Sequence, residues 1–567
     1  MLPAPTPDRA RQNEAGAKRT RVLLAILWGT GAQRHNMEVF HVKRRNFLQV
    51  RAAAVAASGL ASPAIAAQPQ VLKYVPQANL SSIDPIWTTA TVATLHGYMV
   101  YDTLYGIDDK LLPHPQMVAG HTISSDKLTW TLTLRDGLAF HDGAPVRSAD
   151  CIASIERWGK RDGFGQYMMA ITNEMKAVND KTFTIRLKKP FALLPYSLGA
   201  EGCFIMPERV AKTDAFKQIT DATGSGPFVF QPKEFVSGSQ VIYTKNTKYV
   251  PRSGPASYWA GGKVAHFDRV EWKIITDPAT SAAALQRGEV DWWENPIFDL
   301  LPTLEKAKDV TVEALDPLGA LGIIAFNHEQ APLNSHAILR ALLHAVDQKE
   351  YVQAVLGAQA GKFGKYPAGY FTIGSPYANT VGLEALSGPR NIDLAKKLIE
   401  QAGYKGEPVV LMSPSDQPQL QIMAQVTQDL YQKVGMKVQY QSMDWGTLVA
   451  RRAEHKPASQ GGWNSFCTTW GGLQVANPGG SYPLRGNGKA GWFGWPTNPD
   501  IETLRNQWFD APDLAAQQKI CEQIQARAFH DVPFIPVGQW VTPTAHRSNL
   551  TGFVKCGVMV FWNVKRV

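Results

Sequence analysis

The chain has 567 residues, of which 44% are apolar and 19% are charged, a composition typical of a soluble globular protein and not of a disordered one. This length exceeds what one hydrophobic core usually supports, so we expect two or three domains. Residues 1–67 hold ten Lys and Arg against three Asp and Glu, and so carry most of the net charge of +10. The 48 basic and 45 acidic residues that remain form no basic surface, which argues against nucleic-acid binding.

The N-terminal tract predicts an export signal. A basic stretch that ends in Arg44-Arg45 precedes a run of small, mildly apolar residues and then Ala66-Ala67, near which we expect cleavage. Paired arginines before a Phe-Leu dipeptide are similar to the twin-arginine type of signal, with general secretion as the alternative. Met37 is the more ordinary start of such a signal.

Cysteine usage fits an exported chain without a lipid anchor. No Cys stands directly after the expected cleavage site, where a lipid anchor would be attached, so we expect a mature protein that is free in the periplasm. The five cysteines show no C-x-x-C spacing, and we expect them to be buried free thiols. Beyond the signal, the chain has no run of about 20 apolar residues that could span a membrane.

Strands and helices mix along the remaining chain. Alternating apolar and polar residues predict half-buried strands at 129–135, 183–187 and 270–274. A helix is predicted over 278–287, because Asp277-Pro278 offers a cap and a first turn and Gly288 can adopt the left-handed stop. A strand at 289–292 should follow.

Two further helix–Gly signals are present toward the C-terminus. One helix is predicted over 391–402 and another over 418–434, the second followed by a strand at 436–440. Residues 456–500 are rich in Gly, Pro, Asn and Trp and predict a long, irregular but ordered loop. Repeated helix–Gly–strand units indicate an α/β fold.

No catalytic or metal motif is present, so we expect no catalytic residue, no metal and no cofactor. His328-Glu329 is followed by Pro332, which forbids the helix of a zinc-protease motif. Residues 486–491 fit G-x-G-x-x-G but lack the strand and helix that a dinucleotide site requires. Asp291 and Glu294 are expected to be surface carboxylates with ordinary pKa values.

Several stretches resemble the peptide/nickel solute-binding family, the extracellular components of dipeptide- and oligopeptide-type importers. The strongest is 134–150, which is similar to the family pattern L-R-x-G-x-x-F-x-D-G-x-P-x-x-A-x-D over seventeen residues in register. Weaker resemblances occur in the family's order at 82–85, 101–104, 224–228, 284–291, 326–347 and 395–404. Together they cover about residues 71–540.

The resemblance implies an α/β fold, that of a two-lobed type II periplasmic binding protein with an extra domain inserted in its first lobe. The first lobe would comprise 71–106, 227–320 and 537–567, the inserted domain 107–226, and the second lobe 321–536. The implied function is the extracytoplasmic solute-binding component of an ABC importer. It would capture a small solute between the lobes by hinge closure and deliver it to the permease subunits, as a monomer.

The resemblance also indicates which residues face the solute. A segment shortly after the family's L-D-P and a strand of the second lobe flank the ligand in peptide-binding members. These correspond here to Trp87, Thr88 and Thr89 and to Thr469, Trp470 and Gly471, with Trp293 and Trp445 as weaker candidates. The alternative for Trp87 and Trp470 is that both are ordinary core tryptophans.

The chain departs from the family at one informative position. Leu473 stands where an acid would pair with the α-ammonium of a peptide. A buried ammonium without a carboxylate partner is costly to desolvate, which predicts a solute without a free α-amine, whether N-blocked, neutral or anionic. The alternatives are a conventional di- or oligopeptide-binding protein, or an exported enzyme or periplasmic chaperone on the same fold.

Overall fold

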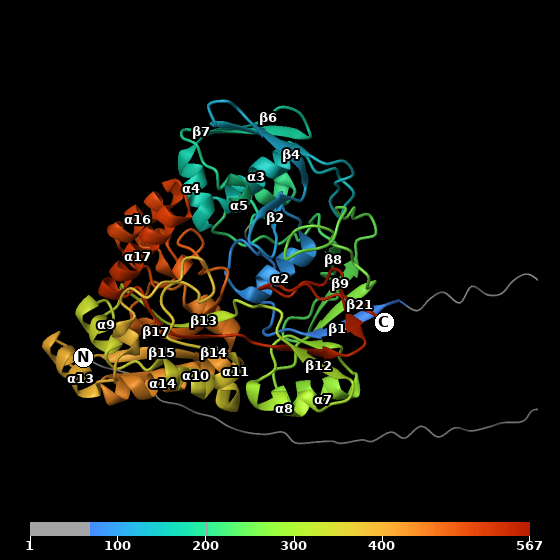
Figure 1. The fold of residues 1–567 in the computed structure, drawn as a ribbon. Helices are drawn as coiled ribbons and strands as arrows, with labels where there is room; N and C mark the ends of the chain where they lie inside the picture. The colour runs from blue at the N-terminus through green and yellow to red at the C-terminus, as the bar shows by residue number, and fades with distance from the viewer. Residues whose placement is uncertain (1–68, 200–201) are drawn as a thin grey trace, which may run out of the picture. The chain divides into compact units, whose positions relative to one another are not determined.

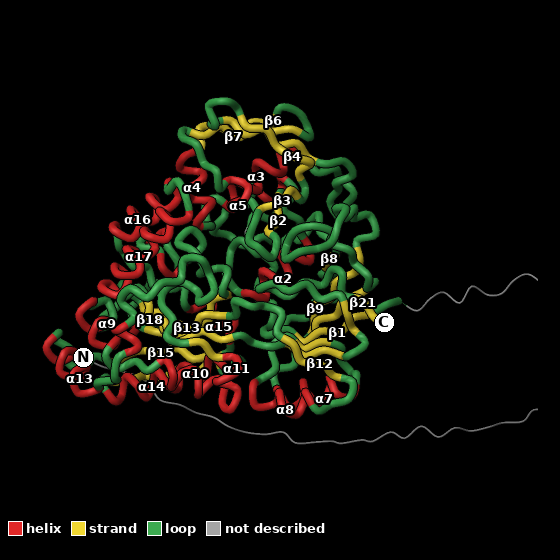
Figure 2. Tube along the Cα trace, in the orientation of Figure 1, coloured by secondary structure: helices red, strands yellow, loops and turns green. Residues whose placement is uncertain are grey.

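The computed structural model describes residues 69–199 and 202–567, which belong to one compact unit, Pro69–Val567. The expected signal, its cleavage near Ala66-Ala67 and the start at Met37 lie outside these residues. Within the described part of the chain, no helix is both long and apolar enough to cross a membrane. Helices and strands mix throughout, and the strands form three larger sheets and two small ones (Figures 1 and 2).

The first sheet has seven strands in the order β12-β19-β11-β1-β10-β9-β8. Strand β1 runs parallel to both β10 and β11, whereas β9 and β19 run antiparallel to their neighbours. Buried and half-exposed residues alternate along β10, which places Trp272 in the core beside Tyr74 and Phe561. The strands are β1 Val71–Val75, β8 Phe228–Phe230, β9 Gln240–Lys245, β10 Arg269–Lys273, β11 Trp292–Trp293, β12 Val310–Glu313 and β19 Thr544–Arg547.

The second sheet has six strands in the order β14-β18-β13-β17-β15-β16. Its central strand β13 is apolar throughout and almost fully buried, as expected of a strand covered on both faces. Strand β15 runs parallel to β16 and β17, whereas β13 pairs antiparallel with β17 and β18. The strands are β13 Ala320–Phe326, β14 Gly364–Lys365, β15 Pro408–Pro414, β16 Lys437–Met443, β17 Ser465–Gly471 and β18 Phe534–Trp540.

The third sheet is antiparallel, with its strands in the order β4-β5-β7-β6. Its strands are β4 Val118–Ile123, β5 Thr129–Leu134, β6 Thr172–Ala177 and β7 Thr182–Leu187. Trp130, Leu132, Phe183 and Ile185 turn one face of β5 and β7 into the core, where helix α3 packs. The small sheets pair β2 Tyr105–Ile107 with β3 Pro113–Pro115 and β20 Leu550–Thr551 with β21 Lys565–Arg566.

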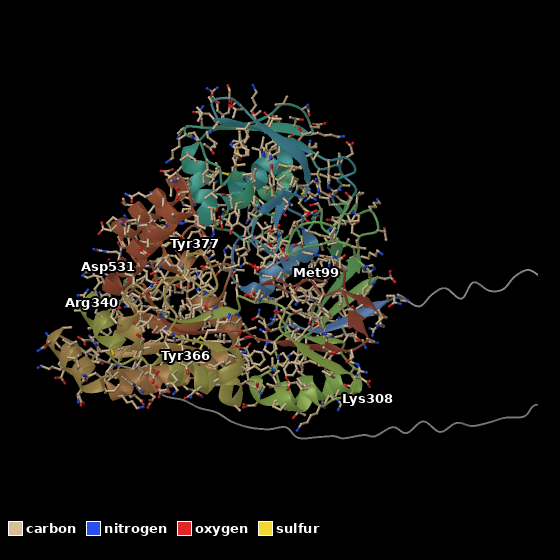
Figure 3. All side chains as sticks on the ribbon, viewed as in Figure 1. Met99, Lys308, Arg340, Tyr366, Tyr377 and Asp531 are labelled. Carbon is tan, nitrogen blue, oxygen red and sulfur yellow. The ribbon has the colours of Figure 1, made fainter. Side chains whose placement is uncertain are left out.

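Helices pack against the sheets and against one another. Helix α2 contacts β8 of the first sheet, α10 and α14 pack on the second sheet, and α16 packs against α17. Figure 3 marks Met99 on α2, and Tyr377 contacts Trp508 of α16. The helices are α2 Thr91–Val100, α3 Ser148–Trp158, α4 Gly163–Ile171, α5 Leu194–Ser197, α6 Glu208–Ala211, α7 Pro278–Arg287, α8 Leu301–Glu305, α9 His336–Leu343, α10 Gln348–Leu356, α11 Ala360–Phe363, α12 Glu384–Ser387, α13 Ile392–Gln401, α14 Pro418–Lys433, α15 Trp445–Arg451, α16 Pro499–Asp510 and α17 Leu514–Asp531.

The locally encoded predictions are confirmed. The strands predicted at 129–135, 183–187 and 270–274 are β5, β7 and β10, and the helix predicted over 278–287 is α7 with its Asp277 cap and left-handed Gly288. The helices predicted over 391–402 and 418–434 are α13 and α14, and the strand after them is β16.

Two predictions of local structure are wrong. The strand expected at 289–292 is instead Trp292–Trp293, because only these residues reach β1 and β19. The tract 456–500 is not all loop: Ser465–Gly471 forms β17 in the middle of the second sheet, stabilised by its pairing with β13. Long-range pairing here overrides a composition that disfavours strands.

Candidate functional site

A cavity of about 210 Å³ is lined by residues from both the first and the second sheet. On the first-sheet side, its wall is formed by the chain that leaves the ends of the parallel strands β1, β10 and β11, at 76–79, 274–276 and 293–295. On the second-sheet side, the chain that leaves β15 contributes 416–420, and β17 contributes 468–471. The carboxyl ends of parallel strands are where α/β folds commonly place ligands, because the connecting loops diverge there.

Six of the eight predicted site residues line this cavity. They come from the first-sheet side and from the second-sheet side alike: Thr89, Trp293, Trp445, Thr469, Trp470 and Gly471. The remaining two, Trp87 and Thr88, do not line it. A role of any of these side chains in solute binding stays a prediction.

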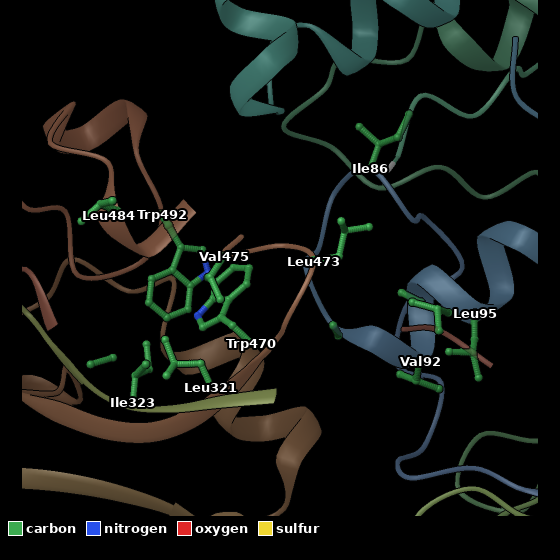
Figure 4. Close-up of a cluster of buried hydrophobic side chains, with 14 of the residues drawn as sticks. Ile86, Val92, Leu95, Leu321, Ile323, Trp470, Leu473, Val475, Leu484 and Trp492 are labelled. Carbon is green, nitrogen blue, oxygen red and sulfur yellow. The ribbon is translucent and has the colours of Figure 1, made fainter. Parts of the chain in front are cut away.

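Trp470 is held between other aromatic rings. Its ring is stacked on Tyr482 at 5.8 Å and meets the edge of Trp492 at 5.1 Å between ring centroids. Figure 4 shows Trp470 and Trp492 close together over Leu321 and Ile323 of β13. Trp470 is thus both a packed core residue and part of the cavity wall, so the two alternatives for it do not exclude each other.

Trp87 and Thr88 belong to a loop whose backbone is held by hydrogen bonds to Asp84. The Asp84 carboxylate accepts hydrogen bonds from the backbone N–H groups of Ile86 and Trp87, at 3.0 and 3.2 Å. Thr88 is buried and accepts a hydrogen bond from the N–H of Ala90 through its hydroxyl oxygen. These residues therefore shape the loop that presents Thr89 to the cavity.

A buried ion pair fixes Asp84. Arg157 of α3 donates from Nη1 to Asp84 Oδ1 at 3.1 Å and from Nη2 to Oδ2 at 2.6 Å. Both side chains are almost completely buried, at 1% and 0% exposure. Arg157 also donates to the carbonyl oxygens of Thr213 and Lys217, and Asp84 accepts from the N–H of Ile219.

Three carboxylates line the cavity, and the sequence-based expectation for one of them is wrong. Glu294 is not on the surface but only 3% exposed, and burial raises its pKa to about 7. It accepts hydrogen bonds from the backbone N–H and the side-chain amide of Gln77, at 2.7 and 3.2 Å. Burial also raises the pKa of Asp316 to about 6 and that of Asp416 above its usual value.

Asp291 is also buried, but it lies outside the cavity and has structural partners. It accepts hydrogen bonds from the N–H of Lys73 at 2.8 Å and from Arg566 at 2.9 Å. Proximity in sequence to Glu294 therefore does not place the two carboxylates in one site, because they stand on opposite sides of strand β11.

Arg452 follows helix α15 and lines the cavity, although it is not among the site residues predicted from the sequence. Its guanidinium lies against Trp445, Trp492 and Phe493, with its central carbon 4.5 Å from the Phe493 ring centroid. Burial lowers the pKa of Arg452 to about 9. The Arg451-Arg452 pair at the end of a helix is a common surface pattern, and only the fold reveals that its second member turns inward.

Leu473, the position that predicts a solute without a free amine, lies outside the cavity. It is buried and lines a separate small hollow together with Asp162 and Phe164. The absence of an acid at position 473 does not leave the cavity without carboxylates, since Glu294, Asp316 and Asp416 line it.

Over residues 69–199 and 202–567, no group of three or more His, Cys, Asp or Glu side chains could hold a metal ion. The five cysteines, all within these ranges, are buried free thiols, as expected.

Comparison with known proteins relates most of the chain to bacterial binding proteins. Residues 113–492 match the family model "Bacterial extracellular solute-binding proteins, family 5 Middle". A probable peptide ABC transporter periplasmic-binding protein of Sinorhizobium fredii is 38% identical over 499 residues, covering 86% of this chain and 92% of that protein. A glutathione-binding protein of Pectobacterium atrosepticum is 27% identical over 533 residues, covering 91% and 97%.

A solved structure shares the fold. The dipeptide-binding protein from Pseudoalteromonas sp. SM9913, in complex with Met-Leu, superposes with a TM-score of 0.74 at 21% identity. The match covers 88% of this chain and all of that one. The mixed α/β architecture is therefore that of periplasmic binding proteins of the peptide-binding type.

Proposed function

Since the chain belongs to the bacterial extracellular solute-binding proteins of family 5, we propose that it closes around one solute molecule in the cavity described above. The protein is the substrate-binding component of an ABC importer for peptides or related solutes. The observation that carries the proposal is that residues of both large sheets line a single cavity. A ligand held there contacts both sides at once and thereby favours the closed state.

We assign the three larger sheets to the cores of three domains. The first sheet would be the core of a first lobe made of 71–106, 227–320 and 537–567, and the second sheet that of a second lobe, 321–536. The third sheet would be the core of the domain inserted at 107–226. Strand β13 passes the limit at 320/321 by one residue and strand β18 passes the limit at 536/537 by four residues, as expected where the chain crosses between lobes.

Direct contacts between the proposed lobes support a closed state. Gln417, after β15, donates from its side-chain amide to the carbonyl oxygen of Gln77, after β1, at 2.6 Å. The Tyr482 hydroxyl donates to Asp162 of the inserted domain at 2.7 Å. Opening the cavity would break the first of these hydrogen bonds. This hydrogen bond therefore contributes to the free energy that favours the closed form over the open form.

The proposal is tested by removing the solute and following closure. The full chain is unfolded and refolded to release any bound solute, and X-ray scattering is compared before and after adding back the solute that mass spectrometry identifies in the natively purified protein. We expect the radius of gyration to fall on addition. An unchanged envelope, or a solute that is recovered chemically altered, would contradict the proposal.

A variant pair sharpens this test. Gln417→Ala removes one interlobe hydrogen bond and should weaken solute binding by up to about tenfold, with a larger radius of gyration at partial saturation. Gln432→Ala, on the exposed face of helix α14, which begins directly after Gln417, is the matched control and should bind as the wild type does.

The chemical state of the solute's amine is a separate question. The prediction of a solute without a free α-amine is tested by calorimetry with dipeptides and their N-acetylated forms on refolded, solute-free protein. Tight binding of the ordinary dipeptides would contradict it. The cavity carboxylates Glu294 and Asp416 would then be the candidate partners of the ammonium.

Location and partners complete the proposal. We propose export to the periplasm through the predicted signal, of the twin-arginine type and without a lipid anchor, and action as a monomer that docks on the importer's permease subunits. Family membership supports the importer partners. Fractionation of cells expressing the full chain tests the location, and Arg44→Lys/Arg45→Lys, which blocks only twin-arginine export, tests the route.

A further inference from the structure

Arg452 is a buried cation whose hydrogen-bonding groups are not used by the protein. The residue is 2% exposed, and its Nε and Nη2 atoms have no hydrogen-bond partner. A guanidinium carries five N–H donors and cannot lose its charge at neutral pH in water. An unpaired buried group of this kind destabilises the folded protein.

Another buried arginine shows what a purely structural guanidinium looks like in this fold. Arg505 of α16 is 3% exposed, close to the value for Arg452, and burial lowers its pKa to about 9 as well. Its Nε and Nη2 atoms nevertheless donate to the carbonyl oxygens of Pro478, Gly163 and Gly479, at 2.6–3.0 Å. The two side chains thus have the same type and similar burial but differ in hydrogen bonding: Nε and Nη2 of Arg505 donate to the protein, whereas Nε and Nη2 of Arg452 remain available for a ligand.

The surroundings of Arg452 hold the guanidinium in place without satisfying it. The rings of Trp445, Trp492 and Phe493 lie 4.5–5.8 Å from its central carbon. Aromatic faces attract a cation through their quadrupole, but they accept no in-plane hydrogen bonds. The in-plane N–H groups of an arginine are the ones that match a carboxylate in two parallel hydrogen bonds.

Arg452 is also the one cationic side chain among the described residues that line the cavity. Trp492, which contacts the guanidinium, also contacts Trp470. The acids Glu294 and Asp316 come from the first-sheet side of the wall, whereas Asp416 comes from the second-sheet side and accepts a hydrogen bond from the backbone N–H of Trp445 at 2.7 Å. A single positive charge balances a singly charged anion and leaves a dianion half compensated. The cavity is therefore suited to a solute with one carboxylate at the Arg452 end.

On the basis of the function proposed above, we propose that Arg452 binds a carboxylate group of the imported solute, and that the aromatic wall of Trp445, Trp492 and Phe493 keeps the guanidinium oriented for it. Arg452 is then a specificity-determining residue. It stays unpaired in the empty protein and becomes paired when the solute binds.

The proposal makes an unusual prediction for the empty protein. After unfolding and refolding of the full chain to remove solute, Arg452→Met should unfold at the same or a higher urea concentration than the wild type, because an unpaired buried charge is removed. The matched variant Arg505→Met should unfold at a lower concentration, because it leaves three carbonyl oxygens without their donor. A loss of stability in Arg452→Met as large as that in Arg505→Met would show a structural role and overturn the proposal.

Acetate serves as the probe for the carboxylate site. At equal pH and ionic strength, acetate in place of chloride should raise the urea midpoint of the wild type more than that of Arg452→Met, because only the wild type keeps the binding site. An effect that is absent from the wild type, or equal in both proteins, would overturn the proposal. Phosphate stabilises folded proteins in general, so the site is reported by the difference between the two proteins. Inorganic phosphate in place of acetate should give a smaller difference in urea midpoint between the wild type and Arg452→Met, and an equal difference would refute the preference for a carboxylate.

The solute recovered from native protein gives the final measurement. Arg452→Met should lose affinity for it on the order of 10²-fold, because the carboxylate would then be buried without its partner. If Arg452→Met keeps wild-type affinity and still closes on the solute, the carboxylate assignment fails while the proposed function stands. If no solute closes even the wild type, the proposed function is what fails.

Discussion

The buried ion pair between Asp84 and Arg157 allows a direct test of what stabilises the loop of Trp87 and Thr88 beside the cavity. Asp84→Ala removes a carboxylate that accepts five hydrogen bonds: two from Arg157 and one each from the N–H groups of Ile86, Trp87 and Ile219. The guanidinium, 1% exposed, then stays buried without its counter-charge. Breaking such a pair on one side destabilises a protein by about 3–5 kcal/mol.

The measurement is the free energy of unfolding from urea titration, followed by tryptophan fluorescence. The matched control is Asp136→Ala, which removes a carboxylate that also pairs with one cation, Lys181, but is 90% exposed. Solvent screens that pair, so the control should lose little or no stability. The loss at Asp84 should exceed the loss at Asp136 several-fold.

A double variant decides whether the unpaired charge is the cause. Asp84→Leu/Arg157→Met removes both charges and should recover a large part of the stability lost in Asp84→Ala, because the buried cation is then gone. If the double variant is as unstable as Asp84→Ala, the loss comes from the loop's hydrogen bonds, and the reasoning from an uncompensated charge is refuted.

Three further outcomes are expected. Because burial raises the pKa of Glu294 from 4.5 to about 7, the folded state binds its proton more tightly, so the contribution of Glu294 to the unfolding free energy should fall by up to about 3 kcal/mol from pH 5 to pH 8; the difference in unfolding free energy between the wild type and Glu294→Gln should change by that amount over this range, and a difference that does not change with pH would refute the assignment. Gly319 and Gly238 both have left-handed backbones, but only at Gly319 would a Cβ lie 2.2 Å from the Trp540 carbonyl oxygen, so Gly319→Ala should cost at least about 1 kcal/mol more than Gly238→Ala, and equal costs would refute this. The five buried thiols should resist a thiol reagent in the native protein and react fully in denaturant, and rapid native labelling would contradict their burial.

The part of the fold that depends on local sequence could be predicted. Helices α7 and α13 begin at Asp277 and Asn391, whose side chains cap the first turn, and α7 ends at a left-handed glycine. Strands with one buried face, such as β5, follow from alternation alone. In each case the determinants lie within a few residues of the element, which is why the sequence carries them.

Features that depend on distant segments could not be predicted in the same way. Strand β17 lies in a Gly- and Trp-rich tract and is a strand because β13 and β15 flank it. Glu294 and Arg452 look like surface charges in the sequence, since nothing nearby reveals that the fold will bury them. Family resemblance indicated Trp470, which lines the cavity and whose contact with a solute stays a prediction, but it says nothing of an arginine outside the matched motifs.

The position of strand β19 has a consequence for biogenesis. It lies between β11 and β12 in the first sheet, so residues 544–547 must pair with segments more than 200 residues earlier in the chain before that sheet is continuous. A nascent chain that has not yet released its final residues exposes two open strand edges, which are templates for misassembly. Contacts this far apart also close slowly. A chaperone that shields the emerging polypeptide until synthesis ends would therefore raise the yield of this protein, and a truncation just before Thr544 should yield aggregates in place of a shortened, folded product.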